Sequence, residues 1–249
     1  MARAALPGRL TWQLGRVAEL STETARTHSI VLDLPGWQGH RAGQHVDVRL
    51  TAPDGYQAQR SYSIASSPED SRLVLTVERL DDGEVSPYLV DELMVGDELE
   101  LRGPIGGYFV WEREFGGPLL LIAGGSGVVP FRSILRHWAA GNRDAAVRLL
   151  YSARTLDDVI YREELRRLAA DDGADIEFTL TREWPQGWSG HRGRIDARLL
   201  EQVAWSPSEE PLVYVCGPSA FVETAAQALV DGGHQPTTIK TERFGPTGT

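Results

Sequence analysis

Four short segments of the chain combine residue types that bind phosphates and flat aromatic ligands. The first is Arg60-Ser61-Tyr62-Ser63, within a run typical of a β-strand. Alternate side chains of a strand point to one face, so Arg60 and Tyr62 can contact one ligand, through a guanidinium fork for phosphate and a ring for stacking. Taken alone, such a segment is more often an edge strand with an exposed arginine.

The second segment, Gly83-Glu84-Val85-Ser86, precedes a short helix that we expect over residues 87–93. Ser86 is a favourable N-cap, and Pro87 suits the first helical position. Free backbone amides and the positive end of the helix dipole would make this start an anion site, to which Ser86 adds a hydroxyl. An ordinary capped helix is the alternative.

The third segment, Gly124-Gly125-Ser126-Gly127-Val128-Val129-Pro130, joins an expected strand at 119–123 to an expected helix at 129–140. Its glycines allow the backbone to approach a pyrophosphate, which then lies at the helix N-terminus. The spacing differs from the usual dinucleotide fingerprint, and Ser152 and Arg154 follow the next strand in place of an acidic residue. An arginine there suits a phosphate better than a bare ribose.

The fourth segment, Cys216-Gly217-Pro218, follows an apolar run at 212–215. The carboxyl ends of parallel strands are where open α/β sheets bind ligands, although a single buried cysteine is more often a packing residue. Because Cys216 is the only cysteine, an internal disulfide is excluded, as is an iron–sulfur cluster held by several thiolates of this chain. We expect a reducing, cytoplasmic setting.

The elements that must position these segments change in type near residue 115. The first part contains short alternating runs separated by turn residues, which indicate an antiparallel barrel or sandwich; they lie at 12–20, 29–34, 45–50, 61–65, 73–77 and 98–101. The second part alternates apolar runs with helices, which indicates a parallel sheet covered on both faces; the runs lie at 119–123, 147–151, 176–180, 212–215 and 237–240, and the helices at 129–140, 159–170 and 220–230.

Composition excludes several classes of function. The net charge of −10, from 25 basic and 35 acidic residues, disfavours nucleic acid as a partner. No apolar run is long enough to span a bilayer, and residues 1–11 do not resemble a signal peptide. The six histidines lack metal-ligand spacing, so we predict no metal.

In this order and on these elements, the four segments resemble the ferredoxin–NADP reductase superfamily, the flavoprotein module also found in oxygenase reductases. The resemblance runs from about residue 12 to residue 245. It implies two domains: an antiparallel flavin-binding β-barrel, residues 1–113, and an α/β parallel-sheet domain for a nicotinamide dinucleotide, residues 114–249.

The resemblance implies that the first two segments bind the flavin, with Gly83 to Ser86 around its pyrophosphate. Arg60 would hold its phosphate, Tyr62 would stack on the isoalloxazine, and Ser63 would hydrogen-bond near N5. Arg79 matches a further contacting segment, with a solvated surface arginine as an equal alternative. The complete flavin set is Arg60, Ser61, Tyr62, Ser63, Arg79, Gly83, Val85, Ser86 and Phe244. FAD is expected rather than FMN.

The resemblance also implies a set of residues for the dinucleotide: Gly124, Gly125, Gly127, Pro130, Ser152, Arg154, Thr181, Arg182, Arg192, Arg194, Cys216, Gly217 and Pro218. Thr181-Arg182-Glu183 is similar to a segment of NADPH-using members, and Arg192 and Arg194 follow it. Several guanidiniums can pair with a 2′-phosphate, so we expect NADPH rather than NADH. A solvated basic loop is the alternative.

Two departures from the family pattern stand out. Val129 occupies a position where many relatives have threonine. The end of the chain lacks the terminal tyrosine of plant-type members, although Phe244 could shield the flavin instead. Residues 242–245 are similar to a stretch that leads into a ferredoxin-like domain in larger reductases. We therefore expect electrons to leave the flavin without an iron–sulfur relay in this chain.

The function that the resemblance implies is electron transfer from NADPH through FAD to an external acceptor, such as a ferredoxin, haem protein or oxygenase component. The catalytic residues would be Ser63, which tunes N5, and Cys216 and Glu223, which line the approach. A diffusible reductase of free flavin, ferric complexes or small quinones is an alternative that no residue excludes. A non-enzymatic dinucleotide-binding sensor is disfavoured because both sets of motifs are intact.

Overall fold

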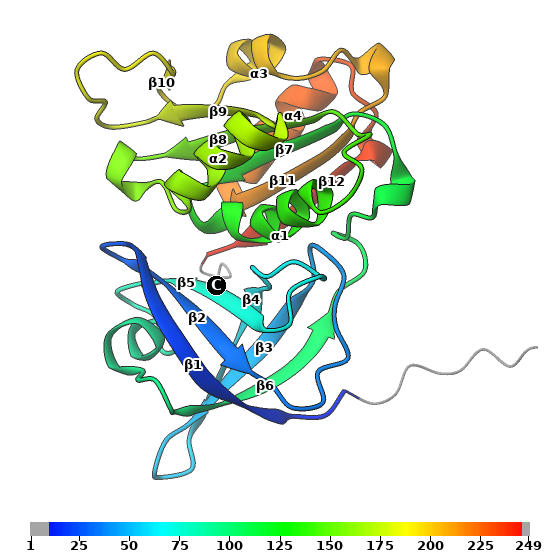
Figure 1. Ribbon diagram of the computed structural model, residues 1–249. Helices are drawn as coiled ribbons and strands as arrows, with labels where there is room; N and C mark the ends of the chain where they lie inside the picture. The colour runs from blue at the N-terminus through cyan, green and yellow to red at the C-terminus, as the bar shows by residue number, and fades with distance from the viewer. Residues whose placement is uncertain (1–9, 246–249) are drawn as a thin grey trace, which may run out of the picture.

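The computed structural model describes residues 10–245, which form two six-stranded sheets, one from each half of the chain (Figure 1). The expected absence of a signal peptide concerns mainly residues 1–9. The second predicted domain ends with residues 246–249. Both stretches lie outside the described residues. The segment between the sheets runs from residue 106 to residue 118, around the predicted domain boundary.

The first sheet is antiparallel, with the strand order β4-β3-β6-β1-β2-β5. Its strands are β1 (Gln13–Thr24), β2 (Thr27–Asp33), β3 (His45–Thr51), β4 (Gln57–Ser63), β5 (Leu73–Glu78) and β6 (Glu98–Ile105). A bridge between Ile64 and Leu75 joins the two ends of this order and closes the barrel. Apolar side chains such as Val48, Leu75 and Leu101 fill its interior. The predicted antiparallel barrel is confirmed.

Two local expectations in the barrel were wrong. Strand β4 begins at Gln57, four residues before the expected start, because it pairs with β3 along its whole length. Most of its side chains face solvent, so its first residues show no alternating apolar pattern. The expected helix is a five-residue π-helix, Tyr88–Glu92, with Pro87 at its N-cap. The Ser86 hydroxyl accepts a hydrogen bond from the Leu80 amide at 3.1 Å and so stabilises the preceding loop instead of the helix.

The second sheet is parallel, with the strand order β10-β9-β8-β7-β11-β12, which confirms the predicted α/β domain. Its strands are β7 (Leu119–Gly124), β8 (Val147–Ala153), β9 (Asp175–Leu180), β10 (His191–Arg192), β11 (Leu212–Pro218) and β12 (Ile239–Phe244). Helices α1 (Val128–Ala139) and α2 (Arg162–Asp172) pack on one face, and α3 (Ala197–Val203) and α4 (Ser219–Asp231) on the other. Short 3-10 turns span Arg113–Phe115, Gly125–Gly127, Leu156–Asp158, Pro207–Glu209 and Pro236–Thr238.

The sequence pattern missed four features of this domain. Strand β10 has two residues and α3 has seven, which is too short for a clear periodic signal. Helix α2 begins at Arg162, after buried Val159 and Ile160, because Tyr161 adopts a left-handed conformation with φ of 60°. Strand β12 continues to Phe244, four residues beyond the expected end.

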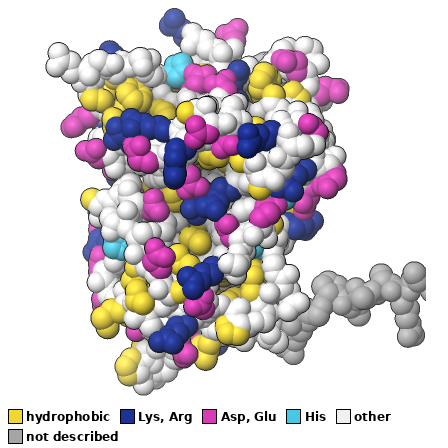
Figure 2. All heavy atoms as spheres, viewed as in Figure 1, with side chains coloured by type: hydrophobic (Ala, Val, Ile, Leu, Met, Phe, Trp, Pro, Cys, Tyr) yellow, Lys and Arg dark blue, Asp and Glu magenta, His cyan; other side chains and the backbone are white. Residues whose placement is uncertain are grey.

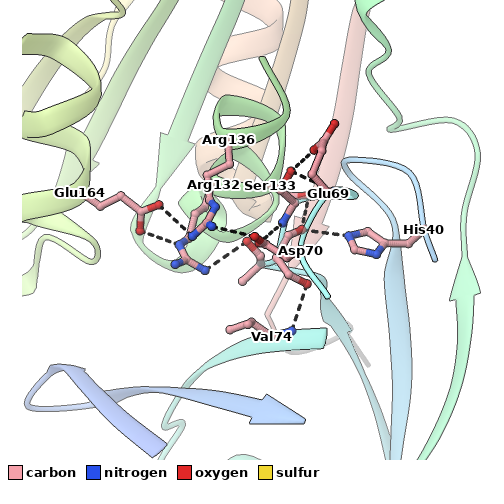
Figure 3. Close-up of polar contacts among 11 residues, drawn as sticks. His40, Glu69, Asp70, Val74, Arg132, Ser133, Arg136 and Glu164 are labelled. Atoms are coloured by element: carbon pink, nitrogen blue, oxygen red, sulfur yellow. Dashed lines mark hydrogen bonds and ion pairs between the residues drawn. The ribbon is translucent and has the colours of Figure 1, made fainter. Parts of the chain in front are cut away.

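Helix α1 lies between the parallel sheet and the barrel, and its polar side chains join the two (Figures 1 and 3). Ser133 Oγ donates to the carbonyl of Ser66, which follows β4, at 2.6 Å. Arg136 pairs with Asp70 of the same barrel segment at 2.8 Å and with Glu164 of α2 at 3.4 Å. These partly buried contacts fix the orientation of α1, and therefore of the loop before it, relative to the barrel.

Two findings concern residues 10–245 as a whole. No helix in this range is long and apolar enough to cross a membrane. No group of three or more histidine, cysteine, aspartate or glutamate residues in the same range is arranged to hold a metal ion.

Candidate functional site

Two adjoining cavities lie where the barrel meets the parallel sheet. The first is lined by Arg60, Ser61, Tyr62, Ser63, Thr76, Glu78, Leu80, Gly83, Glu84, Val85, Ser86, Ser126, Val129 and Phe244. The second is lined by Thr24, Arg26, Thr27, Glu78, Leu80, Gly124, Gly125, Ser126, Ser152, Ala153, Arg154, Asp158, Ile160, Thr181, Pro218, Phe221, Phe244 and Gly245. Glu78, Leu80, Ser126 and Phe244 belong to both, so ligands bound in the two cavities would meet at these four residues.

The end of β4 forms one wall of the first cavity. Arg60 and Tyr62 both line it, as the strand alternation predicts. Arg60 Nη2 donates to Glu84 Oε2 at 2.6 Å, and Tyr56 Oη donates to the other oxygen of the same carboxylate at 2.7 Å. Burial raises the pKa of Tyr62, which keeps its phenol protonated at physiological pH. The wall therefore offers a positioned guanidinium beside a half-buried aromatic ring.

The loop between β5 and the π-helix forms another wall of the first cavity. Gly83 is required there, because a Cβ atom would lie 2.8 Å from Ser86 Oγ and 3.1 Å from the Leu80 carbonyl oxygen. The hydrogen bond from the Leu80 amide to Ser86 Oγ closes the loop and holds Val85 and Ser86 against the cavity. The π-helix has only five residues, so any phosphate binding here depends on the loop itself and not on a helix dipole.

The glycine-rich turn after β7 forms the floor of the second cavity. A Cβ atom on Gly127 would collide with the carbonyl oxygen of Cys216, and one on Gly124 would lie 2.9 Å from the ring of Phe221. Gly125 has a positive φ of 55°. Glycine therefore lets this turn pack directly against β11 and α4, which leaves its outer side open to the cavity.

Most of the predicted cofactor residues line a cavity. Those in the first are Arg60, Ser61, Tyr62, Ser63, Gly83, Val85, Ser86 and Phe244. Those in the second are Gly124, Gly125, Ser152, Arg154, Thr181, Pro218 and Phe244. Gly127, Pro130, Cys216 and Gly217 are buried and line neither cavity, and Gly127 packs closely against the backbone of Cys216 and Gly217.

Five predicted residues lie away from both cavities. Arg79 is held in ion pairs with Asp81 and Asp91. Arg182, Arg192 and Arg194 are exposed and line neither cavity, and Arg192 lies 5.2 Å from the centre of the Trp184 ring. Glu223 is exposed on α4.

A carboxylate that the sequence reasoning missed lies beside Cys216. Glu242 of β12 is opposite Cys216 of β11 in the parallel register. Its Oε2 is buried and has no hydrogen-bond partner among residues 10–245, and this burial raises the pKa of Glu242 to about 7. Burial and the nearby Glu242 also raise the pKa of the Cys216 thiol, which therefore stays protonated. Strand alternation places Glu242 on the same side of β12 as Phe244, and that signal was lost because the strand was expected to end at residue 240.

The tip of the β1–β2 hairpin also reaches the second cavity, through Thr24, Arg26 and Thr27. These residues belong to the barrel, whereas most of the cavity belongs to the α/β domain. Nothing in their local sequence signals this contact, because it depends on how the two domains pack.

Comparison with known proteins assigns the two halves of the chain to different family models. Residues 13–110 match the family model described as an oxidoreductase FAD-binding domain, and residues 121–227 match the model of an oxidoreductase NAD-binding domain. A ferredoxin–NADP reductase B of Sorangium cellulosum is 37% identical, with 81% of this chain and 80% of that protein covered. The chain belongs to the ferredoxin–NADP reductase-like superfamily.

Other members of the superfamily are also similar. The reductase subunit of glycine betaine monooxygenase of Chromohalobacter salexigens is 32% identical over 95% of this chain, which spans 66% of that protein. An NADH-cytochrome b5 reductase 1 of Pyricularia oryzae is 31% identical, with 84% of this chain and 72% of that protein covered. The FAD/NAD-binding domain of a nitric oxide dioxygenase from Vibrio cholerae has the same fold, with a TM-score of 0.84 and 27% identity over 94% of this chain and 99% of that one.

The residues present fit the two cofactors that the family models indicate. The first cavity joins a guanidinium, a half-buried aromatic ring and a tight glycine–serine loop, which suit the phosphate and the ring system of a flavin. The second joins a glycine turn at the start of α1 to polar groups at the ends of β8 and β9, which suit a dinucleotide.

Proposed function

We propose that this chain is a flavin-dependent NAD(P)H oxidoreductase that passes electrons from NADPH through FAD to an external redox protein. The observation that carries the proposal is that the two cavities adjoin and share part of their lining. Glu78, Leu80, Ser126 and Phe244 line both, so a flavin in the first and a nicotinamide in the second would be neighbours. Hydride transfer from a nicotinamide to a flavin requires such contact.

In the first cavity, Arg60 would bind the flavin phosphate, and Tyr62 would pack against its ring. Ser63, at the end of β4, would hydrogen-bond near N5. Bound flavin supplies the chemistry, because it accepts an electron pair from a reduced nicotinamide and can release electrons singly. The protein excludes water from the contact and orients both rings; Phe244, at the boundary of the two cavities, is placed to cover the flavin.

Glu242 replaces Glu223 as our candidate for the carboxylate near the nicotinamide. Neither residue lines a cavity, but Glu223 is exposed on α4, whereas Glu242 is buried beside Cys216. With a pKa of about 7, the Glu242 carboxyl can hold or release a proton at physiological pH. Cys216, which is 1% exposed, would act by packing under the nicotinamide site and not as a nucleophile.

For the choice of nucleotide, we propose that Arg154 is the residue that favours NADPH. It is exposed at the end of β8 and lines the second cavity together with Ser152 and Thr181. Its guanidinium has no hydrogen-bond or ion-pair partner among residues 10–245 and can meet a 2′-phosphate, whereas Arg182 lines neither cavity. The names of the relatives include both NADP and NADH, so Arg154 carries this part of the proposal.

The electron acceptor is proposed from the relatives, whose names include an oxygenase reductase subunit, a ferredoxin reductase and a cytochrome b5 reductase. Each name points to a redox protein as the acceptor. On the face shown in Figure 2, basic and acidic side chains are interspersed, so this face has no extended area of one charge. The single cysteine fits a reducing, cytoplasmic setting, which is also part of the proposal.

The experiment that tests the proposal begins with extraction and mass measurement of the bound flavin, for which we expect FAD. The flavin-loaded protein is then reduced anaerobically with NADPH or NADH, and candidate acceptor proteins are added. Arg154→Gln should lower the preference for NADPH over NADH, while the matched control Arg182→Gln should leave it unchanged. A protein that stays colourless and cannot be reconstituted with any flavin would exclude the proposed function.

A further inference from the structure

The second cavity contains an arginine from the barrel, Arg26, at the tip of the hairpin between β1 and β2. The same cavity is lined by Gly124, Gly125 and Ser126, at the end of β7 and in the turn that follows. A guanidinium from one domain and a glycine turn from the other therefore border the same space.

The hairpin holds Arg26 in place. Thr24 pairs with Thr27 across the turn, and the Arg26 amide donates to Thr24 Oγ at 3.3 Å. The Arg26 carbonyl accepts a hydrogen bond from the Arg79 amide at 2.8 Å, which ties the tip to the end of β5. Further along the hairpin, Ser29 Oγ contacts Thr76 Oγ1 at 2.8 Å. A side chain on such a rigid turn loses less conformational entropy when it binds a ligand.

An acidic residue of the second cavity, Glu78, makes a cation necessary for binding an anionic ligand there. The charged residues that line it are Arg26, Glu78, Arg154 and Asp158. Glu78 Oε2 lies only 3.9 Å from the position that a Cβ atom of Gly125 would take, so a carboxylate faces the glycine turn. An anionic group bound at that turn would be repelled by Glu78 unless a cation lay nearby.

Arg26 is that nearby cation. Thr27, its neighbour in the chain, lies opposite Glu78 in the register of β2 and β5. The Arg26 guanidinium donates to the Arg79 carbonyl at 2.9 Å and lies 3.1 Å from Asp81, and 43% of its side-chain surface is exposed. It is thus oriented by two contacts and still accessible. Arg79, by contrast, has its guanidinium held by Asp81 and Asp91 and lines neither cavity.

We propose that Arg26 binds the pyrophosphate of the nicotinamide dinucleotide from the barrel side, opposite the glycine turn. This inference rests on the proposed function, because it takes the dinucleotide as the ligand of the second cavity. It adds a residue from the flavin domain to the nucleotide site. The dinucleotide would then be held between both domains, and its binding would depend on how they are packed.

The test is equilibrium titration of the flavin-loaded protein with oxidised NADP⁺ and with adenosine 2′-phosphate, which lacks the pyrophosphate. Arg26→Gln should weaken NADP⁺ binding by about tenfold or more, the loss of one charge-assisted contact. It should change the affinity for adenosine 2′-phosphate by less than about threefold, because that ligand does not reach Arg26. Raising the salt concentration should reduce the difference between wild type and variant for NADP⁺.

Asp81→Asn is the matched control, because it breaks the same ion pair and leaves the guanidinium in place. It should bind NADP⁺ as tightly as the wild type or more tightly. Arg26→Lys keeps the positive charge but loses the two-pronged guanidinium, so its affinity for NADP⁺ should lie between those of the wild type and Arg26→Gln. The inference is overturned if Arg26→Gln leaves NADP⁺ binding intact, if both ligands weaken equally, or if Asp81→Asn weakens NADP⁺ binding as much. A wild-type protein that binds flavin but neither nucleotide would overturn the proposed function as well.

Discussion

Replacing Glu242 by glutamine should stabilise the protein at alkaline pH and much less at acidic pH. The Glu242 carboxyl has a buried oxygen without a hydrogen-bond partner among the described residues. Burial raises its pKa from 4.5 to about 7, with desolvation as the cause. A buried neutral amide of the same shape carries no charge that must be desolvated, so the substitution removes the pH-dependent cost.

The magnitude follows from the shift in pKa between the unfolded and folded states. Below pH 4.5 the carboxyl is neutral in both states, and the wild type has its full stability. Between pH 4.5 and about 7 the Glu242 carboxyl is ionised in the unfolded state and still protonated in the folded state, so the free energy of unfolding falls as the pH rises. The shift of about 2.5 units (7 minus 4.5) corresponds to about 3 kcal/mol at 1.36 kcal/mol per unit, as an upper value.

The assay is urea unfolding of the wild type and Glu242→Gln at pH 5 and pH 8.5, followed by fluorescence and circular dichroism together. The gain in unfolding free energy for the variant should be about 1 kcal/mol or less at pH 5 and rise toward 3 kcal/mol at pH 8.5. Glu223→Gln is the control, because its exposed side chain keeps its hydration on folding. An equal gain at both pH values, or the same pH-dependent gain in the control, would show that the buried Glu242 carboxyl is not the cause.

Three further substitutions test other parts of the site. Arg60→Gln should weaken flavin binding by about ten- to a hundredfold, the loss of a charge-assisted phosphate contact, when flavin release is titrated by fluorescence. Arg72→Gln, which breaks an exposed pair with Asp33 outside both cavities, should not weaken it. Gly127→Ala should destabilise the protein by about 2 kcal/mol or more because its Cβ would collide with the Cys216 carbonyl; Gly107→Ala, whose nearest neighbour would be the flexible Arg41 side chain at 3.5 Å, should not. Phe244→Ala should tighten NADP⁺ binding several-fold by opening the boundary between the cavities, and weaker binding in a titration would contradict the role assigned to Phe244.

The order of elements could be predicted from the sequence because each segment carries its own local signal. Alternating runs separated by turns predicted the barrel, and Gly124 to Gly127 between an apolar run and a helix predicted the turn that forms the floor of the second cavity. These patterns depend on residues close together in the chain. Strand pairing and helix packing then followed the predicted classes.

The missed parts of the site depend on contacts between distant residues. Arg26 and Arg79 both follow or precede barrel strands, and only the packing of the hairpin shows that Arg26 lines the cavity while Arg79 pairs with two aspartates. Glu242 is inconspicuous in the sequence, and its burial results from its position opposite Cys216 at the edge of a sheet. Arg182, Arg192 and Arg194 formed a persuasive basic cluster in the sequence, but their side chains line neither cavity.

Single-turnover anaerobic mixing of the flavin-loaded protein with one equivalent of NADPH tests whether the two cofactors meet within this chain. Hydride transfer from NADPH to the flavin requires the two cofactors to be in contact. We therefore predict rapid loss of the flavin's visible absorbance, with no added protein and with one flavin reduced per nucleotide oxidised. Flavin that stays oxidised while NADPH binds tightly would show that the two cavities do not bring the cofactors together, and would contradict the account.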